Sequence, residues 1–105
     1  MFRWQTVLAG LLVLGGLGCG NALYVARATQ ASDELARAEQ FDAAALAPYE
    51  YNYALEHLRK ARSEALEADY SAAISMAEVA YDYATRAVQQ AQRAAPGVMA
   101  PRPVP

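Results

Sequence analysis

The sequence contains one cysteine, Cys19, and one histidine, His57. A single cysteine excludes an intrachain disulfide. A protein metal site needs three or four convergent ligands, and no histidine or cysteine spacing supplies them, so we expect no metal, no cofactor and a surface role for His57. No serine has the glycine-framed setting and partner set of a hydrolase nucleophile. We therefore expect that the protein is not an enzyme.

Clustered basic residues are also absent. The formal net charge is −2 at pH 7, and lysine and arginine are scattered along the chain. A nucleic-acid-binding protein has a concentrated basic stripe or patch, so we expect no nucleic-acid partner. Glycine is confined to the first 20 residues and Gly97, which leaves no glycine-rich phosphate loop between strand and helix. The function classes that these absences leave open are protein interaction and a structural role.

An uncharged apolar run follows Arg3 and ends in Gly16-Leu17-Gly18-Cys19-Gly20. A charged start, an apolar core and small residues at the cut are typical of a secretory signal peptide. The last five residues also resemble a lipobox, the cleavage motif of bacterial lipoproteins, although Gly16 stands where leucine is usual. The resemblance implies that residues 1–18 are removed and that Cys19 carries a covalent lipid. In the common sorting scheme of such lipoproteins, an aspartate directly after the lipidated cysteine favours retention in the inner membrane. Gly20 stands at this position, which favours an outer-membrane lipoprotein facing the periplasm.

Two other interpretations of the N-terminus stay open. Residues 4–26 carry no charge, and a membrane-spanning helix needs about 20 apolar residues. The segment is therefore long enough for an uncleaved anchor in the inner membrane, although glycines and Asn21 interrupt its second half. A plain signal peptide that leaves a free Cys19 thiol is the other alternative.

The remaining sequence predicts an all-α fold. Residues 21–45, 48–68 and 70–94 are rich in helix-favouring residues and carry apolar side chains at steps of three and four. Pro48 suits the first turn of the second helix, and Asp69 suits the N-cap of the third. The short turn between these two helices predicts an antiparallel hairpin. The first helix either completes a small three-helix bundle or forms a stalk.

The apolar positions define an expected core. The first helix offers Tyr24, Ala28, Ala31, Leu35, Ala38 and Phe41, the second offers Tyr51, Leu55, Leu58, Ala61 and Ala65, and the third offers Tyr70, Ile74, Ala77, Tyr81, Ala84, Val88 and Ala91. The third set alternates steps of four and three, as in a coiled-coil seam. We also expect close packing of the hairpin through Ala61, Ala65, Ala73, Ala77 and Ala80.

These predictions divide the chain into four segments. Residues 1–18 are the signal peptide, 19–47 an N-terminal helix or stalk, 48–94 the helical hairpin and 95–105 a proline-rich tail. Proline lacks a backbone donor and fixes φ, so we expect the tail to be disordered. The alternative is that it serves as a ligand for a groove that binds polyproline conformation.

Three tyrosines, Tyr49, Tyr53 and Tyr83, fall outside the expected core. Tyrosine is common at binding interfaces because it joins apolar area to a polar tip. We identify these three residues as a candidate interaction face. The alternative is that the first helix covers them, because a small domain needs that burial.

Residues 46–80 include the pattern APYEY…A…L.KAR.EA..ADY.AA…AE.A. This pattern resembles a short helical domain of unknown function that occurs in many Gram-negative envelope lipoproteins. The resemblance implies an envelope location, a helical fold and no enzymatic activity. Asp69-Tyr70 with Ala73-Ile74 also resembles the second helix of a tetratricopeptide repeat, but only one copy is present, and such repeats need about three units.

The sequence therefore predicts a non-enzymatic outer-membrane lipoprotein that acts as a helical interaction or structural module. Its partners are the bilayer, through Cys19, and an envelope protein of unknown identity. Two further hypotheses stay open: a binder of a small molecule or peptidoglycan fragment, and a homo-oligomer assembled through the seam of residues 70–91.

Overall fold

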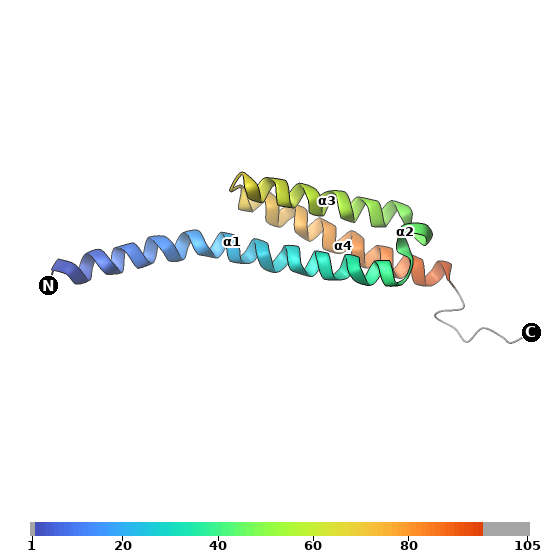
Figure 1. Ribbon diagram of the computed structural model, residues 1–105, viewed down its shortest axis with the longest axis horizontal. Helices are drawn as coiled ribbons and strands as arrows, with labels where there is room; N and C mark the ends of the chain where they lie inside the picture. Colours follow the sequence, from blue (N-terminus) through green and yellow to red (C-terminus); the bar gives the residue numbers. More distant parts are fainter. Residues whose placement is uncertain (1, 96–105) are drawn as a thin grey trace, which may run out of the picture.

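The computed structural model describes the backbone of residues 2–95 and the side chains of residues 20–95. The described backbone forms four helices, α1 (Phe2–Gln40), α2 (Ala43–Leu46), α3 (Pro48–Leu66) and α4 (Tyr70–Ala94). No strand occurs in this part of the chain, which confirms the all-α prediction. The three long helices lie side by side, and α2 caps one end of them (Figure 1).

Helix α1 belongs to the bundle along its C-terminal half. Gly20 lies against Tyr70, and the Nε atom of Arg27 lies 3.5 Å from Oε1 of Glu78. Both helices advance in the same direction through these contacts, so α1 is parallel to α4 and antiparallel to α3. The earlier part of α1 extends beyond the turn between α3 and α4 (Figure 1). Of the two predicted forms, a hairpin or a three-helix bundle, the structure has the three-helix bundle.

The prediction of one continuous helix over residues 21–45 was wrong at both ends. Helix α1 begins at Phe2 and ends at Gln40, and the short α2 follows. Between them Asp42 has a left-handed φ of 59°, and its backbone N–H donates to the Glu39 carbonyl at 3.0 Å. Aspartate tolerates this conformation better than most residues. Composition did not reveal the break, because alanine and leucine favour helix on both sides of it.

The hairpin formed by α3 and α4 has the turn that the sequence predicted, with α3 ending two residues early. The backbone N–H of Ala68 donates to the Ala65 carbonyl and that of Asp69 to the Glu64 carbonyl, both at 3.0 Å. This is a Schellman closure, which satisfies carbonyls at the end of α3. Asp69 then begins α4, because its Oδ1 accepts a 3.1 Å hydrogen bond from the Ala72 backbone N–H. The N-cap prediction is confirmed.

The core consists mainly of alanine. Small side chains allow neighbouring helix axes to approach closely, which suits a bundle of this size. The buried apolar residues are Ala31, Leu35, Ala38, Ala43, Ala47, Ala54, Leu58, Ala61, Ala73, Ala77, Ala80, Ala84, Ala87, Val88 and Ala91. Larger side chains, such as Tyr51, Leu55 and Phe41, are half-buried and pack against this alanine core from its edges.

Tyr81 was predicted to be in the core, but 44% of it is exposed. Its neighbour Ala80, which was predicted to pack within the hairpin, is fully buried. Helix α4 packs against both α1 and α3, so its buried surface is broader than one seam and is centred on alanines. Tyr70 and Ile74 lie half-buried at its edge. Because the middle of the predicted seam is already buried inside the bundle, a second copy could use it only if the bundle opened.

Several predictions lie beyond the described side chains. Among the residues whose side chains are described, no helix is long and apolar enough to cross a membrane. The side chains of residues 1–19 and all of residues 96–105 lie outside the described part, and nothing in the structure tests the cleavage of residues 1–18 or the lipid on Cys19, which stay predictions.

Candidate interaction surface

The structure brings Tyr49, Tyr53 and Tyr83 together. The rings of Tyr53 in α3 and Tyr83 in α4 have centroids 4.0 Å apart. The Tyr49 ring lies one helical turn away, 5.9 Å from Tyr53 and 6.5 Å from Tyr83. Antiparallel pairing of α3 with α4 places residues from distant parts of the sequence at the same level. The three tyrosines therefore form one aromatic cluster that spans two helices.

The cluster is anchored at one side and open at the other. Tyr83 packs against the buried core, Tyr53 is half-buried, and 66% of Tyr49 is exposed. Tyr51, whose hydroxyl bonds to Glu39 of α1, marks the face of α3 that meets α1. Side chains two residues apart on a helix point in directions about 200° apart around the helix axis. Tyr49 and Tyr53 therefore point away from α1, and the alternative that the first helix covers all three tyrosines was wrong for Tyr49.

Two further side chains extend the cluster. The His57 ring stacks on Tyr53 with centroids 4.1 Å apart and planes 23° apart. Its Nδ1 lies 2.9 Å from the Tyr53 carbonyl, and because a carbonyl can only accept, Nδ1–H donates this bond. The Arg86 guanidinium lies 4.7 Å from the Tyr83 ring centroid, and its Nη2 pairs with Asp82 at 3.0 Å. We call Tyr49, Tyr53, His57, Tyr83 and Arg86 the tyrosine surface.

His57 was predicted to be a surface histidine, and its part in this cluster was missed. The signal was present, because residues four apart on a helix, such as Tyr53 and His57, are neighbours on one face. The contacts with Tyr83 and Arg86 had no such signal, because they depend on how α3 and α4 are paired.

An open groove of about 610 Å³ runs along this surface. Its lining residues are Pro48, Tyr49, Asn52, Tyr53, Glu56 and His57. The Asn52 amide donates to the Pro48 carbonyl at 2.7 Å, and Glu56 pairs with Arg59 at 2.7 Å. The polar groups thus have local partners, and aromatic and proline rings supply most of the contact area. Such a groove suits a ligand with flat apolar faces.

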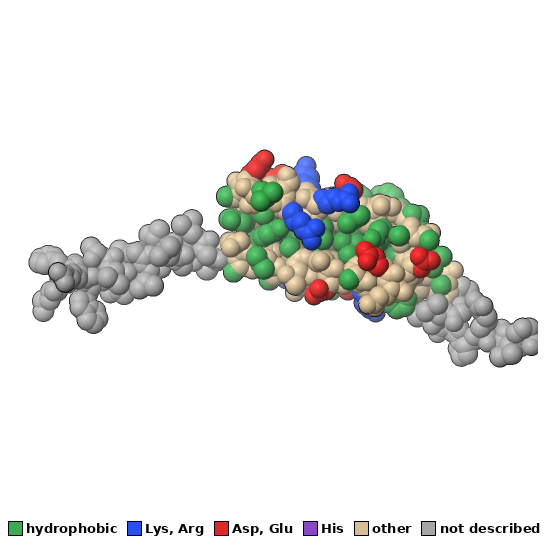
Figure 2. Space-filling view, viewed as in Figure 1, with side chains coloured by type: hydrophobic (Ala, Val, Ile, Leu, Met, Phe, Trp, Pro, Cys, Tyr) green, Lys and Arg blue, Asp and Glu red, His purple; other side chains and the backbone are tan. Residues whose placement is uncertain are grey.

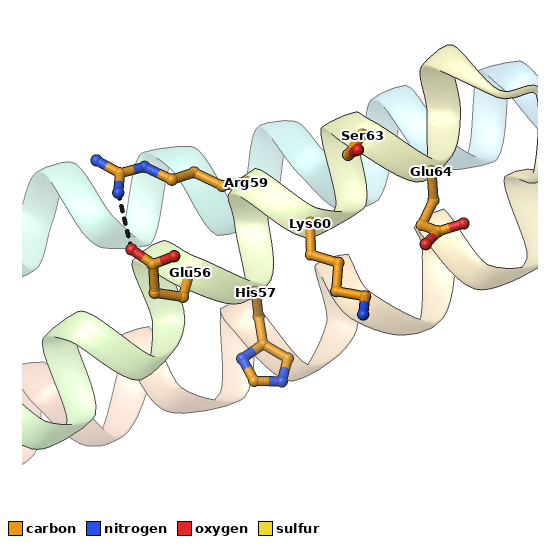
Figure 3. A pocket seen from close by; sticks show the side chains of 6 residues that line it. All are labelled: Glu56, His57, Arg59, Lys60, Ser63 and Glu64. Carbon is orange, nitrogen blue, oxygen red and sulfur yellow. Dashed lines mark hydrogen bonds and ion pairs between the residues drawn. The ribbon is translucent and has the colours of Figure 1, made fainter.

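A second depression, of about 560 Å³, adjoins the groove and shares Glu56 and His57 with it (Figure 3). All six lining residues come from α3, and their side chains fan outward rather than converge on one point (Figure 3). Within the described residues, no group of three or more histidine, cysteine, aspartate or glutamate side chains could hold a metal ion.

The charges on the visible face of the bundle have both signs (Figure 2). Lysine and arginine side chains alternate there with aspartate and glutamate, and apolar side chains lie between them (Figure 2). A single-sign field that would steer a highly charged partner does not occur on this face.

The chain matches no protein-family model, no curated protein and no solved structure. The resemblance of residues 46–80 to a domain of Gram-negative envelope lipoproteins stays a prediction from the sequence motif, as does the likeness to part of a tetratricopeptide repeat.

Proposed function

We propose that this protein is a non-enzymatic lipoprotein of the bacterial outer membrane, anchored by Cys19, that presents the tyrosine surface to another envelope protein. The observation that carries the proposal is the distance between anchor and surface. Gly20, which follows Cys19 directly, lies against Tyr70 at the turn end of the hairpin. The tyrosine surface lies further along α4, around Tyr83.

Helix geometry gives the scale of this arrangement. Tyr83 lies about 13 residues beyond Tyr70 in one continuous helix, which corresponds to about 20 Å at 1.5 Å per residue. A lipid on Cys19 would therefore hold the turn between α3 and α4 close to the bilayer. The tyrosine surface would then stand clear of the headgroups, where a periplasmic protein can reach it.

The lipid anchor is tested by the intact mass of the protein extracted from membranes. We expect the mass of residues 19–105 plus a covalent lipid, and we expect Cys19→Ser to abolish both cleavage and lipid attachment. A mass equal to the uncut chain would contradict the lipoprotein proposal. It would instead favour an uncleaved anchor helix in the inner membrane.

The interaction surface is tested with two matched variants, Tyr49→Ala and Tyr81→Ala. Both tyrosines are exposed, but only Tyr49 belongs to the tyrosine surface. After crosslinking in solubilised envelopes, we expect a product that wild type and Tyr81→Ala share and that Tyr49→Ala loses. Circular dichroism should show equal helicity in all three proteins. Equal crosslinking of both variants would contradict the assignment of this face.

A second candidate function, the binding of a small molecule or peptidoglycan fragment, rests on the groove beside Tyr49 and Tyr53. Aromatic rings can stack against the apolar faces of sugars, and the lining of this open groove is mainly apolar. Thermal unfolding with a panel of cell-wall fragments tests this candidate. A midpoint that rises in wild type but not in Tyr53→Ala would support it, and a flat response would count against it.

A further inference from the structure

We propose that the groove on the tyrosine surface is a polyproline-binding site and that its occupant is residues 96–105 of the same chain. This inference rests on the tyrosine surface of the proposed function, where an envelope partner would displace the tail, and it is independent of the lipid anchor. It names the class of ligand that the surface takes, a proline-rich segment in the polyproline II conformation.

The chemistry of the groove matches such a segment. Grooves lined by aromatic rings bind proline-rich segments because proline rings are flat and apolar, and because the polyproline II conformation is already ordered before binding. Here Pro48, Tyr49, Tyr53 and His57 supply the rings, and Glu56 lies at the rim. Residues 96–105 read PGVMAPRPVP and contain four prolines.

The spacing of the rings also fits. Polyproline II rises about 3.1 Å per residue with three residues per turn. Pro101 and Pro103 would therefore lie about 6 Å apart along the segment axis, against 5.9 Å between the ring centroids of Tyr49 and Tyr53. Pro101, Pro103 and Val104 would then share one apolar side, and Arg102 would lie on the remaining edge.

The segment starts close enough to reach the groove. Helix α4 ends at Ala94, about 11 residues or about 17 Å beyond Tyr83. Ten residues of polyproline II span about 31 Å, which is enough to return to the groove. Gly97 is the residue best suited to the reversal, since it adopts positive φ without steric cost. Tethering raises the effective concentration to the millimolar range, so a weak contact is sufficient.

The test uses the full chain in detergent micelles with Cys19→Ser, which removes the native thiol, and Pro105→Cys, which carries a nitroxide spin label. We expect the label to reduce the NMR signals of Tyr49, Tyr53 and His57 to less than half of their intensity in the reduced, diamagnetic sample. Signals from Asp33, on the far side in α1, should keep their intensity. Uniform broadening, or none at Tyr49 and Tyr53, would overturn the proposal.

A matched variant and a mixing experiment complete the test. Pro101→Ser with Pro103→Ser keeps the length and the label, and we expect it to restore the tyrosine signals. Broadening that appears only when spin-labelled and isotope-labelled copies are mixed would assign the contact to a second copy and overturn occupancy within one chain. Partner crosslinking that still depends on Tyr49 while no broadening occurs would defeat this inference and leave the proposed function standing.

Discussion

The hydroxyl of Tyr51 in α3 donates a 2.7 Å hydrogen bond to Oε1 of Glu39 in α1. This bond, followed by partial burial and the negative charge of Glu39, raises the pKa of Tyr51 above its ordinary value of 10.0. The contact joins the first helix to the hairpin at the level where α2 closes the bundle. It therefore gives a direct measure of whether α1 is part of the folded unit.

The bond needs a protonated phenol, so its contribution depends on pH. Because the folded-state pKa lies above the unfolded value, the contribution is fully present below pH 10.0 and is lost as the pH rises through the raised pKa. At neutral pH we expect Tyr51→Phe to lower the free energy of unfolding by roughly 0.5–1.5 kcal/mol. Urea denaturation should show this difference shrinking above pH 10.0. Tyr81→Phe is the control, and an equal pH dependence in both variants would contradict the assignment.

The turn between α3 and α4 contains a strained residue, Ala68, with a φ of 58°. A residue with a Cβ atom pays roughly 1 kcal/mol or more in this left-handed conformation, and glycine avoids that cost. We expect Ala68→Gly to raise the free energy of unfolding by roughly 0.5–1 kcal/mol. Asp42→Gly, at a φ of 59°, should raise the free energy of unfolding by less, because aspartate tolerates this conformation. Thermal denaturation of both variants checks the order, and a destabilised Ala68→Gly would show that the turn is not strained.

The alanine core leaves no room for larger side chains. Ala84 is fully buried in the cluster that also contains Ala31 and Ala54, so all three long helices meet there. Overpacking such a site costs typically 1–3 kcal/mol. We therefore expect Ala84→Leu to lower the free energy of unfolding by about 1–3 kcal/mol. We also expect it to loosen the contact of α1 with the hairpin. Ala36→Leu makes the same change at an exposed position in α1 and should stay within about 0.5 kcal/mol. Similar losses at both positions would argue against close helix packing.

Thr85 carries a buried hydroxyl, Oγ1, without a hydrogen-bond partner. An unsatisfied buried polar group costs about 1–3 kcal/mol, and valine has nearly the same shape without that group. We expect Thr85→Val to raise the free energy of unfolding by roughly 1 kcal/mol. Thr29→Val, at an exposed position of α1, should change it by less than about 0.5 kcal/mol. A clear loss of stability in Thr85→Val would mean that the hydroxyl makes a stabilising bond in solution.

The tyrosine surface illustrates how far sequence reasoning reaches into a site. Helical periodicity separated Tyr49, Tyr53 and Tyr83 from the expected core, and it could have joined His57 to Tyr53. It gave no means of joining Tyr83 to Tyr53, because that contact depends on the register between α3 and α4. Register follows from how the two alanine faces fit together, and alanines at many positions look alike in a sequence.

The sequence by itself determined the helical class and the sharp boundaries. Pro48 begins α3 because proline fits the first helical turn, and Asp69 begins α4 because its carboxylate accepts a backbone N–H. These are local effects that act within a few residues. Only the tertiary structure decided that α1 ends at Gln40, that Tyr81 is exposed, and that Tyr53 meets Tyr83. The exposure of Tyr81 and the Tyr53–Tyr83 contact depend on the packing of α4 against α1 and α3, where the close approach of the backbones favours small side chains.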